Sequence, residues 1–214
     1  MPGQQLHTTA LVLARQPSGS DSFEQFTVFS AESGLILCLQ RLPRPASSSR
    51  RAPVSRSEGP IDLFDQIEVW LESSNQGRTW FIKEHRHLAR HTGIGRSYDA
   101  LKAAAALATL VTRNPVPDDS QERIAALLLQ SLGALDQGAR ADLVWLKSLF
   151  CFLRDEGLPV RQHWWQLLPA AEREAATGVL NRAIAEQDPA APLVATLTRK
   201  LEQWTDAETE IRFR

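Results

Sequence analysis

The chain has 214 residues, of which 43% are hydrophobic, and its formal net charge at pH 7 is -1. This length accommodates one large domain or two modest ones, and the apolar fraction excludes a globally disordered chain. The near-zero net charge gives no overall reason to expect a nucleic-acid or membrane partner, so such a partner would need a local patch of charge.

The N-terminal part of the chain predicts strands joined by short turns. In the fourth of these strands, the aliphatic residues Ile67, Val69 and Leu71 alternate with Glu68, Trp70 and Glu72. This is the period-two pattern of a half-buried antiparallel strand. Five such strands, with short turns and one long loop, favour a small closed barrel or sandwich. The predicted strands are residues 8–15, 23–30, 35–40, 61–73 and 78–85.

From Ser97 onward the chain is rich in alanine and leucine at helical spacing. Ser97 is the expected N-cap of the first helix, and Asp118 followed by Gln121 resembles a capping box for the second. Gly157 predicts the end of the third helix, which carries a broad apolar stripe at Leu143, Leu146, Leu149, Phe150 and Leu153. The predicted helices are residues 97–113, 118–138, 139–157, 170–187 and 191–206.

The order of these elements predicts an α+β protein of two domains. A five-stranded β-barrel occupies residues 1–88, and an all-α domain occupies residues 89–214. Cys38 and Cys151 lie in apolar runs and are interpreted as buried free thiols of a reducing compartment. No apolar run reaches the length of a membrane span and the N-terminus lacks the basic lead of a signal peptide, so a cytoplasmic protein is expected.

The segment EHRHLARH (84–91) brings His85, His87 and His91 together in sequence. A catalytic zinc helix of this spacing usually has an acid between its histidines, and HLARH has none. A surface segment at the domain junction is therefore favoured over a metal site, although zinc or nickel binding stays an alternative.

No motif in the chain predicts catalysis. The glycines of GIGRS (93–97) do not fit a phosphate loop or a dinucleotide fingerprint, and no nucleophile elbow is present. Trp164 and Trp165 are expected to pack in the core or between domains, with stacking or peptide binding as the alternative. We predict that the protein is not an enzyme and uses no cofactor.

The stretch RLPRPASSSRRAPVSRSEGP (41–60), called the basic stretch below, concentrates positive charge. It holds five arginines, and Glu58 is its only acidic residue. A guanidinium group can donate two parallel hydrogen bonds to phosphate oxygens, and the prolines and serines disfavour regular structure. Composition alone leaves two alternatives open, a phosphate-binding element and a solvated linker that serves solubility.

Several motifs follow one another along residues 8 to about 90: the turn at 18–21, Phe29-Ser30 followed by Gly34-Leu35, and the segment 59–64 after the basic stretch. In this order and spacing, these residues resemble the RecO family of recombination-mediator and DNA-repair proteins. The resemblance continues more loosely through the helices to FLRDEGLPV (152–160).

This resemblance implies an N-terminal OB-fold, a helical C-terminal domain, and binding of single- and double-stranded DNA without sequence preference. It also implies strand annealing and loading of RecA, in partnership with RecR and with the C-terminal tail of the single-strand-binding protein. It implies no catalytic residue and no nucleotide cofactor. Many family members carry a four-cysteine zinc site after the third helix, but VRQHWWQLLPAAERE (160–174) has no cysteine, so no metal is expected.

We therefore expect a cytoplasmic, nucleoid-associated DNA-binding protein. A protein-interaction adaptor that has the same fold but has lost DNA binding is the alternative function. The residues expected to contact nucleic acid are Arg41, Arg44, Arg50, Arg51, Arg56, Arg15 and Lys83.

Overall fold

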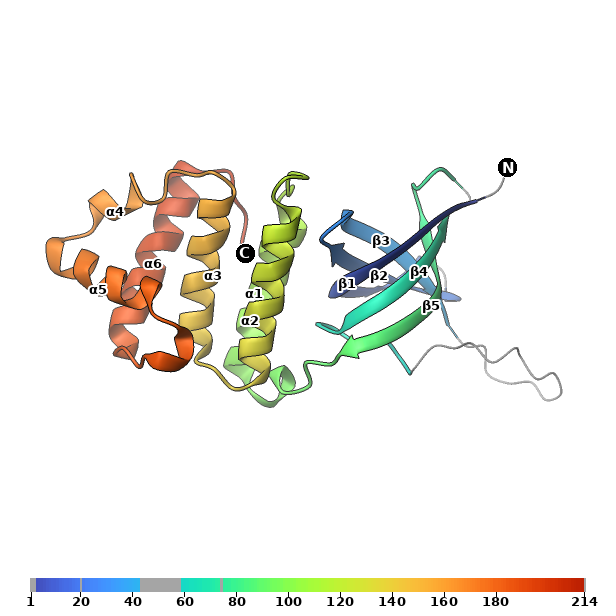
Figure 1. Ribbon diagram of the computed structural model, residues 1–214, viewed down its shortest axis with the longest axis horizontal. Helices are drawn as coiled ribbons and strands as arrows, with labels where there is room; N and C mark the ends of the chain where they lie inside the picture. The colour runs from blue at the N-terminus through green and yellow to red at the C-terminus, as the bar shows by residue number, and fades with distance from the viewer. Residues whose placement is uncertain (1–2, 20, 43–58, 74, 214) are drawn as a thin grey trace. The chain divides into compact units, whose positions relative to one another are not determined.

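The structure is a computed structural model of the chain, and it describes residues 3–19, 21–42, 59–73 and 75–213. The chain divides into two compact units, Met1–Arg90 and His91–Arg214, which are called the barrel unit and the helical unit (Figure 1). An N-terminal five-stranded sheet followed by helices confirms the predicted α+β class. Within the described residues, no helix combines the length and the apolar character needed to cross a membrane.

The strands of the barrel unit form a closed barrel in the order β1-β2-β3-β5-β4. All neighbouring strands are antiparallel except β3 and β5, which pair in parallel through Cys38 with Trp80 and Leu39 with Phe81. The strands are β1 (Gln4–Pro17), β2 (Phe23–Ser30), β3 (Gly34–Arg41), β4 (Gln66–Ser73) and β5 (Trp80–Ala89).

Alternate residues of each strand fill the barrel interior, because successive side chains point to opposite faces of a sheet. Cys38 belongs to this core, and burial raises the pKa of its thiol to about 12, so the thiol stays protonated at neutral pH. Cys151 is only partly buried, so the expectation of two buried thiols was wrong for that residue. The barrel core includes Ala10, Val12, Phe26, Val28, Ile36, Ile67, Val69 and Leu71.

Two predicted strand boundaries were wrong for identifiable reasons. Strand β4 begins at Gln66 rather than at residue 61, because Phe64 has a positive φ of 66° and the chain turns there. The backbone N–H of Asp62 donates to the Asp65 carboxylate at 2.9 Å, which closes this turn. Strand β1 is longer than predicted because its first half pairs with β4 and its second half with β2.

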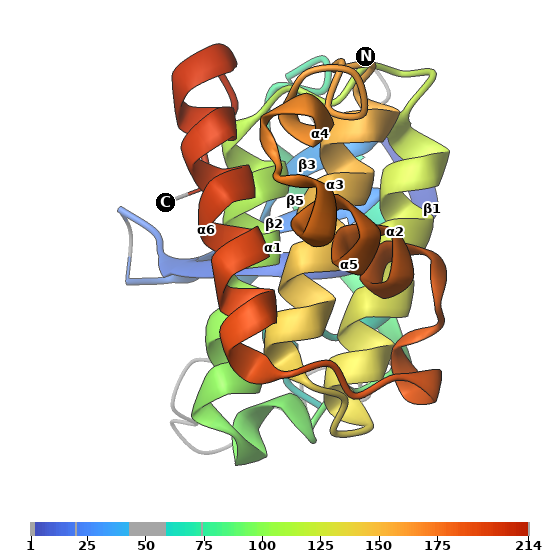
Figure 2. The ribbon, with the colours of Figure 1, turned by 90° about the vertical axis from the view of Figure 1, so that its left-hand side faces the viewer.

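The helical unit is built around α3 (Ala141–Asp155). This helix contacts α1 (Tyr98–Arg113), α2 (Gln121–Asp136) and α6 (Ala191–Glu208), and it lies between α6 and α2 in Figure 2. All five residues of its predicted apolar stripe are buried, which confirms that prediction. Each such buried side chain stabilises the folded state by about 1.5–3 kcal/mol.

The helix ends differ from the predictions at several points. Ser97 caps α1 as predicted and accepts a hydrogen bond from the backbone of Ala100. The predicted capping box was wrong, because α2 begins after Ser120 and Asp118 instead accepts from the side-chain amide of Gln121 at 2.8 Å. A one-turn helix, α4 (Trp164–Leu167), was not predicted, and it places Trp164 in the core.

Helix α5 (Ala170–Asn181) ends six residues earlier than predicted. The Lys147 ammonium group donates to the carbonyls of Val179, Leu180 and Arg182, at 3.1, 2.8 and 2.7 Å. These bonds satisfy carbonyls that a continuing helix would have used, and a cation at this end also interacts favourably with the helix dipole.

Gly93 is a position where the helical unit requires glycine. Its backbone N–H donates to Asp136 Oδ1 at 2.6 Å, and an added Cβ would lie 2.2 Å from the Asp136 carbonyl oxygen. Gly93→Ala is therefore expected to lower the free energy of unfolding by about 1–3 kcal/mol, because backbone must move. The measurement is urea unfolding. Gly95→Ala is the matched control, since no atom lies within 4 Å of its added Cβ, and an equal cost at both positions would contradict the argument.

Candidate nucleic-acid interface

The basic stretch is attached at both ends to the barrel unit. It begins at Arg41, the last residue of β3, and its final residues Gly59 and Pro60 are again described, ahead of β4. Both ends belong to one compact unit, so the stretch does not connect the barrel unit to the helical unit. Four of the arginines predicted to contact nucleic acid lie outside the described residues: Arg44, Arg50, Arg51 and Arg56.

Arg41 is exposed on the outer face of the barrel, at the point where the basic stretch begins. Its cross-strand partner in the β2–β3 ladder is Phe23. Within the described residues, the Arg41 guanidinium makes no ion pair. Arg41 can therefore meet an incoming phosphate without first releasing a described carboxylate partner.

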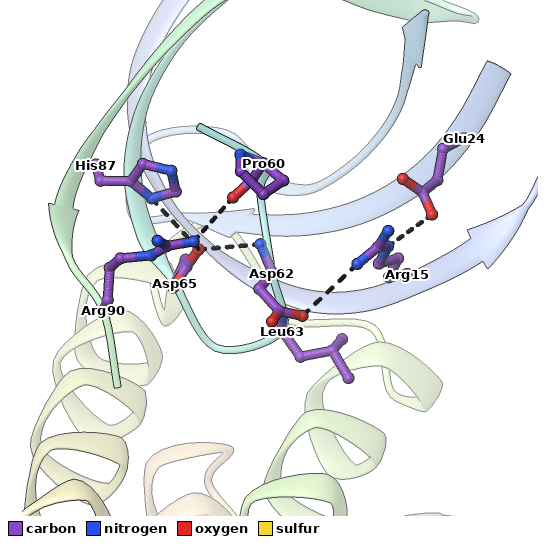
Figure 3. Close-up of polar contacts among 8 residues, drawn as sticks. All are labelled: Arg15, Glu24, Pro60, Asp62, Leu63, Asp65, His87 and Arg90. Carbon is purple, nitrogen blue, oxygen red and sulfur yellow. Dashed lines mark hydrogen bonds and ion pairs between the residues drawn. The ribbon is translucent and has the colours of Figure 1, made fainter. Parts of the chain in front are cut away.

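Arg15 already has carboxylate partners. Its Nε donates to Glu24 Oε1 at 2.6 Å, and its Nη1 lies 3.8 Å from Asp62 Oδ1 (Figure 3). The hydrogen bond to Glu24 raises the pKa of Arg15, and the two carboxylates add to this effect against desolvation. A phosphate at this position would have to compete with two acids.

Lys83 is also paired, with its Nζ 2.6 Å from Glu72 Oε2. Both side chains are substantially exposed, and exposed ion pairs of this kind contribute about 0–1 kcal/mol. A phosphate can compete with Glu72 for Lys83, but the net gain in binding free energy is smaller than at a cation that has no carboxylate partner. Of the predicted contact residues that the structure describes, Arg41 is consequently the best placed to bind a phosphate.

The chain that follows the basic stretch, Gly59–Asp65, is called the return segment. Arg90 Nη2 donates to the Pro60 carbonyl at 2.9 Å and lies 3.6 Å from Asp65 Oδ2. His87 Nδ1 lies 3.3 Å from the same carboxylate oxygen, and Figure 3 shows these groups converging on Asp65. Backbone hydrogen bonds with Val12 in β1 hold the segment from the other side. The end of the basic stretch is thus fixed to β1 and β5.

The prediction that EHRHLARH is a surface segment was wrong for two of its histidines. The strand β5 continues through this sequence, so His85 and His87 point toward the barrel interior. His85 is fully buried, and its Nε2 bonds the Gly59 carbonyl at 2.9 Å. His91 lies beyond the strand, so His87 and His91 do not share a helix face. In the part of the chain that is described, no group of three or more His, Cys, Asp or Glu side chains is arranged to hold a metal ion.

The outer face beside Arg41 is apolar, which the sequence reading did not single out. Phe23 of β2 and Phe81 of β5 lie on either side of β3, with ring centroids 5.8 Å apart in an edge-to-face arrangement. Leu39, the register partner of Phe81, lies on the same face, and Leu35 and Leu37 continue it along β3 as exposed side chains. The run LILCL in β3 could have indicated this apolar outer face, because it is apolar at both odd and even positions and so on both faces of the strand.

The helical unit has a cavity of about 320 Å³ between α4 and α6, lined by residues that include Trp164, Leu168 and Trp204. Lys200 also lines it, and its Nζ donates to Glu172 Oε2 at 2.5 Å. Glu208 contributes a negative charge to the rim. The cavity has the apolar character needed to accept a partner side chain, but its charges do not single out an acidic peptide.

No protein-family model matches the chain, and no curated protein matches it in sequence.

Proposed function

We propose that the barrel unit is an OB-fold and that the protein is a DNA-binding recombination mediator in DNA repair. The barrel binds single- and double-stranded DNA without sequence preference, through the arginines of the basic stretch. The observation that carries the proposal is the position of Arg41. It is exposed, makes no ion pair within the described residues, and stands where the basic stretch leaves the barrel.

The strand order supports the assignment to the OB-fold. A five-stranded Greek-key barrel with long loops is a recurring platform for oligonucleotides. Here β1 pairs with both β2 and β4, and the parallel β3–β5 pair closes the barrel. The basic stretch lies between β3 and β4 in the chain, so both of its ends are attached to strands of the barrel. Phosphate contacts of this kind position the nucleic acid without reading sequence.

The biological role follows from the resemblance to the RecO family. In this role the protein promotes annealing of complementary strands and loads RecA together with RecR, and it acts at the nucleoid in the cytoplasm. The C-terminal tail of the single-strand-binding protein is a further proposed partner. The proposal involves no catalytic residue and no cofactor.

A protein-interaction adaptor with the same fold is the second candidate. The observation that favours it is the exposed apolar face of β3, where Leu35 is 38% and Leu37 is 48% exposed. Exposed apolar patches often mark interaction sites. An electrophoretic shift with a single-stranded oligonucleotide at low salt separates the two functions, because an adaptor that has lost DNA binding gives no shift.

The contrast between Arg41 and Arg15 tests the proposed function at the level of single residues. Arg41→Ala should lower the affinity for a single-stranded 20-mer about fivefold at 0.1 M salt, because one phosphate contact on a single strand releases about 0.7 counterions. Arg15→Ala should change it less than about twofold, because Glu24 and Asp62 already engage its guanidinium.

The measurement is fluorescence anisotropy with several oligonucleotide sequences. Arg41→Ala should weaken the binding of all of them alike. A loss confined to one sequence, or a larger loss for Arg15→Ala than for Arg41→Ala, would contradict the phosphate-binding role of Arg41.

A further inference from the structure

We infer that Phe23, Leu39 and Phe81 form a platform on which unpaired nucleobases stack, and that this platform makes the barrel prefer single strands to duplexes. The three residues are called the base platform below. This inference rests on the proposed function and deepens it. The arginines bind phosphates, which single strands and duplexes both expose. The base platform instead contacts the faces of unpaired bases, which only a single strand exposes.

The strand register places the base platform on the outer face. In β2 the interior positions are Phe26 and Val28, so Phe23 has the opposite parity and points outward. In β3 the interior positions are Ile36 and Cys38, and Leu39 therefore also points outward. The same alternation puts Phe81 outside, between the inward-facing Trp80 and Ile82.

The members of the platform are neighbours across three strands. Leu39 and Phe81 are register partners in the parallel β3–β5 pair, so their side chains leave neighbouring strands on the same face of the sheet. Phe23 reaches Phe81 across β3, with ring centroids 5.8 Å apart and ring planes at 65°. Phe23 and Phe81 are each only partly buried. Two neighbouring aromatic rings are thus left partly accessible on the outer face, and a ligand with its own flat apolar surface could cover them.

The charge at this face favours a polyanion over an apolar protein segment. Arg41 is the register partner of Phe23, so a basic side chain leaves the neighbouring strand on the same outer face. Lys83 lies two residues after Phe81 on β5. Its Nζ is 2.6 Å from Oε2 of Glu72, which is the register partner of Phe81 in β4. Among the described residues, the platform is therefore bordered by Arg41, which makes no ion pair there, and by the Lys83–Glu72 ion pair. Aromatic rings beside cations are the combination that binds single-stranded nucleic acid, with about 1–3 kcal/mol per stacked base.

A duplex cannot use this platform. Its bases are stacked on one another, and only their edges are accessible in the grooves. Unpaired bases can leave the stack and lie on an aromatic ring. The platform thus adds binding energy for a single strand that does not depend on salt, in contrast to the phosphate contacts.

The experiment compares three fluorescein-labelled probes by anisotropy: a 20-nucleotide oligothymidylate, an abasic strand of the same length, and a 20-base-pair duplex. The unsubstituted protein should bind the oligothymidylate about tenfold or more tightly than the abasic strand. Phe81→Ala should remove about tenfold of the oligothymidylate affinity and leave the other two affinities within about twofold. Phe81→Trp should retain the preference, because the indole also stacks.

Tyr98→Ala is the control, because Tyr98 is an aromatic residue that is 78% exposed in the helical unit and outside the platform. It should leave all three affinities unchanged. Equal binding of the oligothymidylate and the abasic strand by the unsubstituted protein would overturn the base platform, and this comparison requires no variant to fold. An equal loss of duplex and single-strand binding in Phe81→Ala would also overturn it. Failure of the unsubstituted protein to bind any of the three probes would instead refute the proposed function and leave the apolar face to a protein partner.

Discussion

Replacing Arg41, Arg44, Arg50, Arg51 and Arg56 together with alanine is expected to lower the affinity for a single-stranded oligonucleotide about 1000-fold or more at 0.1 M salt. Each phosphate contact on a single strand releases about 0.7 counterions, which is worth about fivefold in affinity at this concentration. Five independent contacts then multiply to about three thousandfold. Equilibrium anisotropy with a labelled 20-mer measures the loss directly.

The matched control replaces the same five arginines with lysine. Lysine keeps the charge and loses the bidentate geometry of the guanidinium, so we expect this variant to retain most of the affinity. Unfolding curves of both variants should overlay that of the unsubstituted protein. An alanine variant that binds within about tenfold of the unsubstituted protein would show that the basic stretch is not the phosphate-binding element.

The second large effect is expected at Asp65, which is buried at the end of the barrel with 3% of its surface exposed. Its carboxylate accepts the Asp62 backbone N–H and lies near the side chains of His87 and Arg90. Asp65→Ala leaves the partly buried backbone N–H of Asp62 without its acceptor and removes the buried charge that faces Arg90. We expect a loss of about 3 kcal/mol in the free energy of unfolding, measured by urea denaturation of the full chain.

Two neighbouring substitutions give this prediction its control. Asp62→Ala removes an exposed carboxylate whose partners among the described residues are the Leu63 N–H at 2.8 Å and Arg15 Nη1 at 3.8 Å, so it should cost under about 1 kcal/mol. Asp65→Asn keeps an acceptor for the Asp62 N–H, so its loss in the free energy of unfolding should fall between those of Asp65→Ala and Asp62→Ala. Equal costs for Asp65→Ala and Asp62→Ala would mean that the return segment is not fixed through Asp65.

The strands and helices could be predicted where local periodicity decides the structure. Ile67, Val69 and Leu71 alternate in sequence and alternate in the barrel core, and the apolar stripe of α3 is buried as its spacing indicated. The short helix α4 has too few residues to show a period. The end of α5 depends on Lys147, which reaches it from another helix, so no local signal marks it.

The candidate site could be predicted only in part, because its geometry depends on contacts that are distant in sequence. The local sequence around His85 is polar, yet the residue is buried and bonds Gly59, 26 positions away. Arg15 and Lys83 look like available cations in sequence, but cross-strand neighbours pair with both. Phe23 and Phe81 become neighbours only through the pairing of three strands. The role proposed for Arg41 could be put forward from the sequence, because the proposal rests on composition and on the place of Arg41 at the end of a strand.

The salt dependence of single-strand binding tests the central claim most directly. The affinity of the unsubstituted protein for a labelled 20-nucleotide strand should be measured between low and moderate salt, with log K plotted against log salt concentration. If the five arginines contact phosphates, the slope should be about -3.5, and it should fall toward zero in the five-alanine variant. A flat plot for the unsubstituted protein would contradict the account, because binding would then not depend on phosphate contacts.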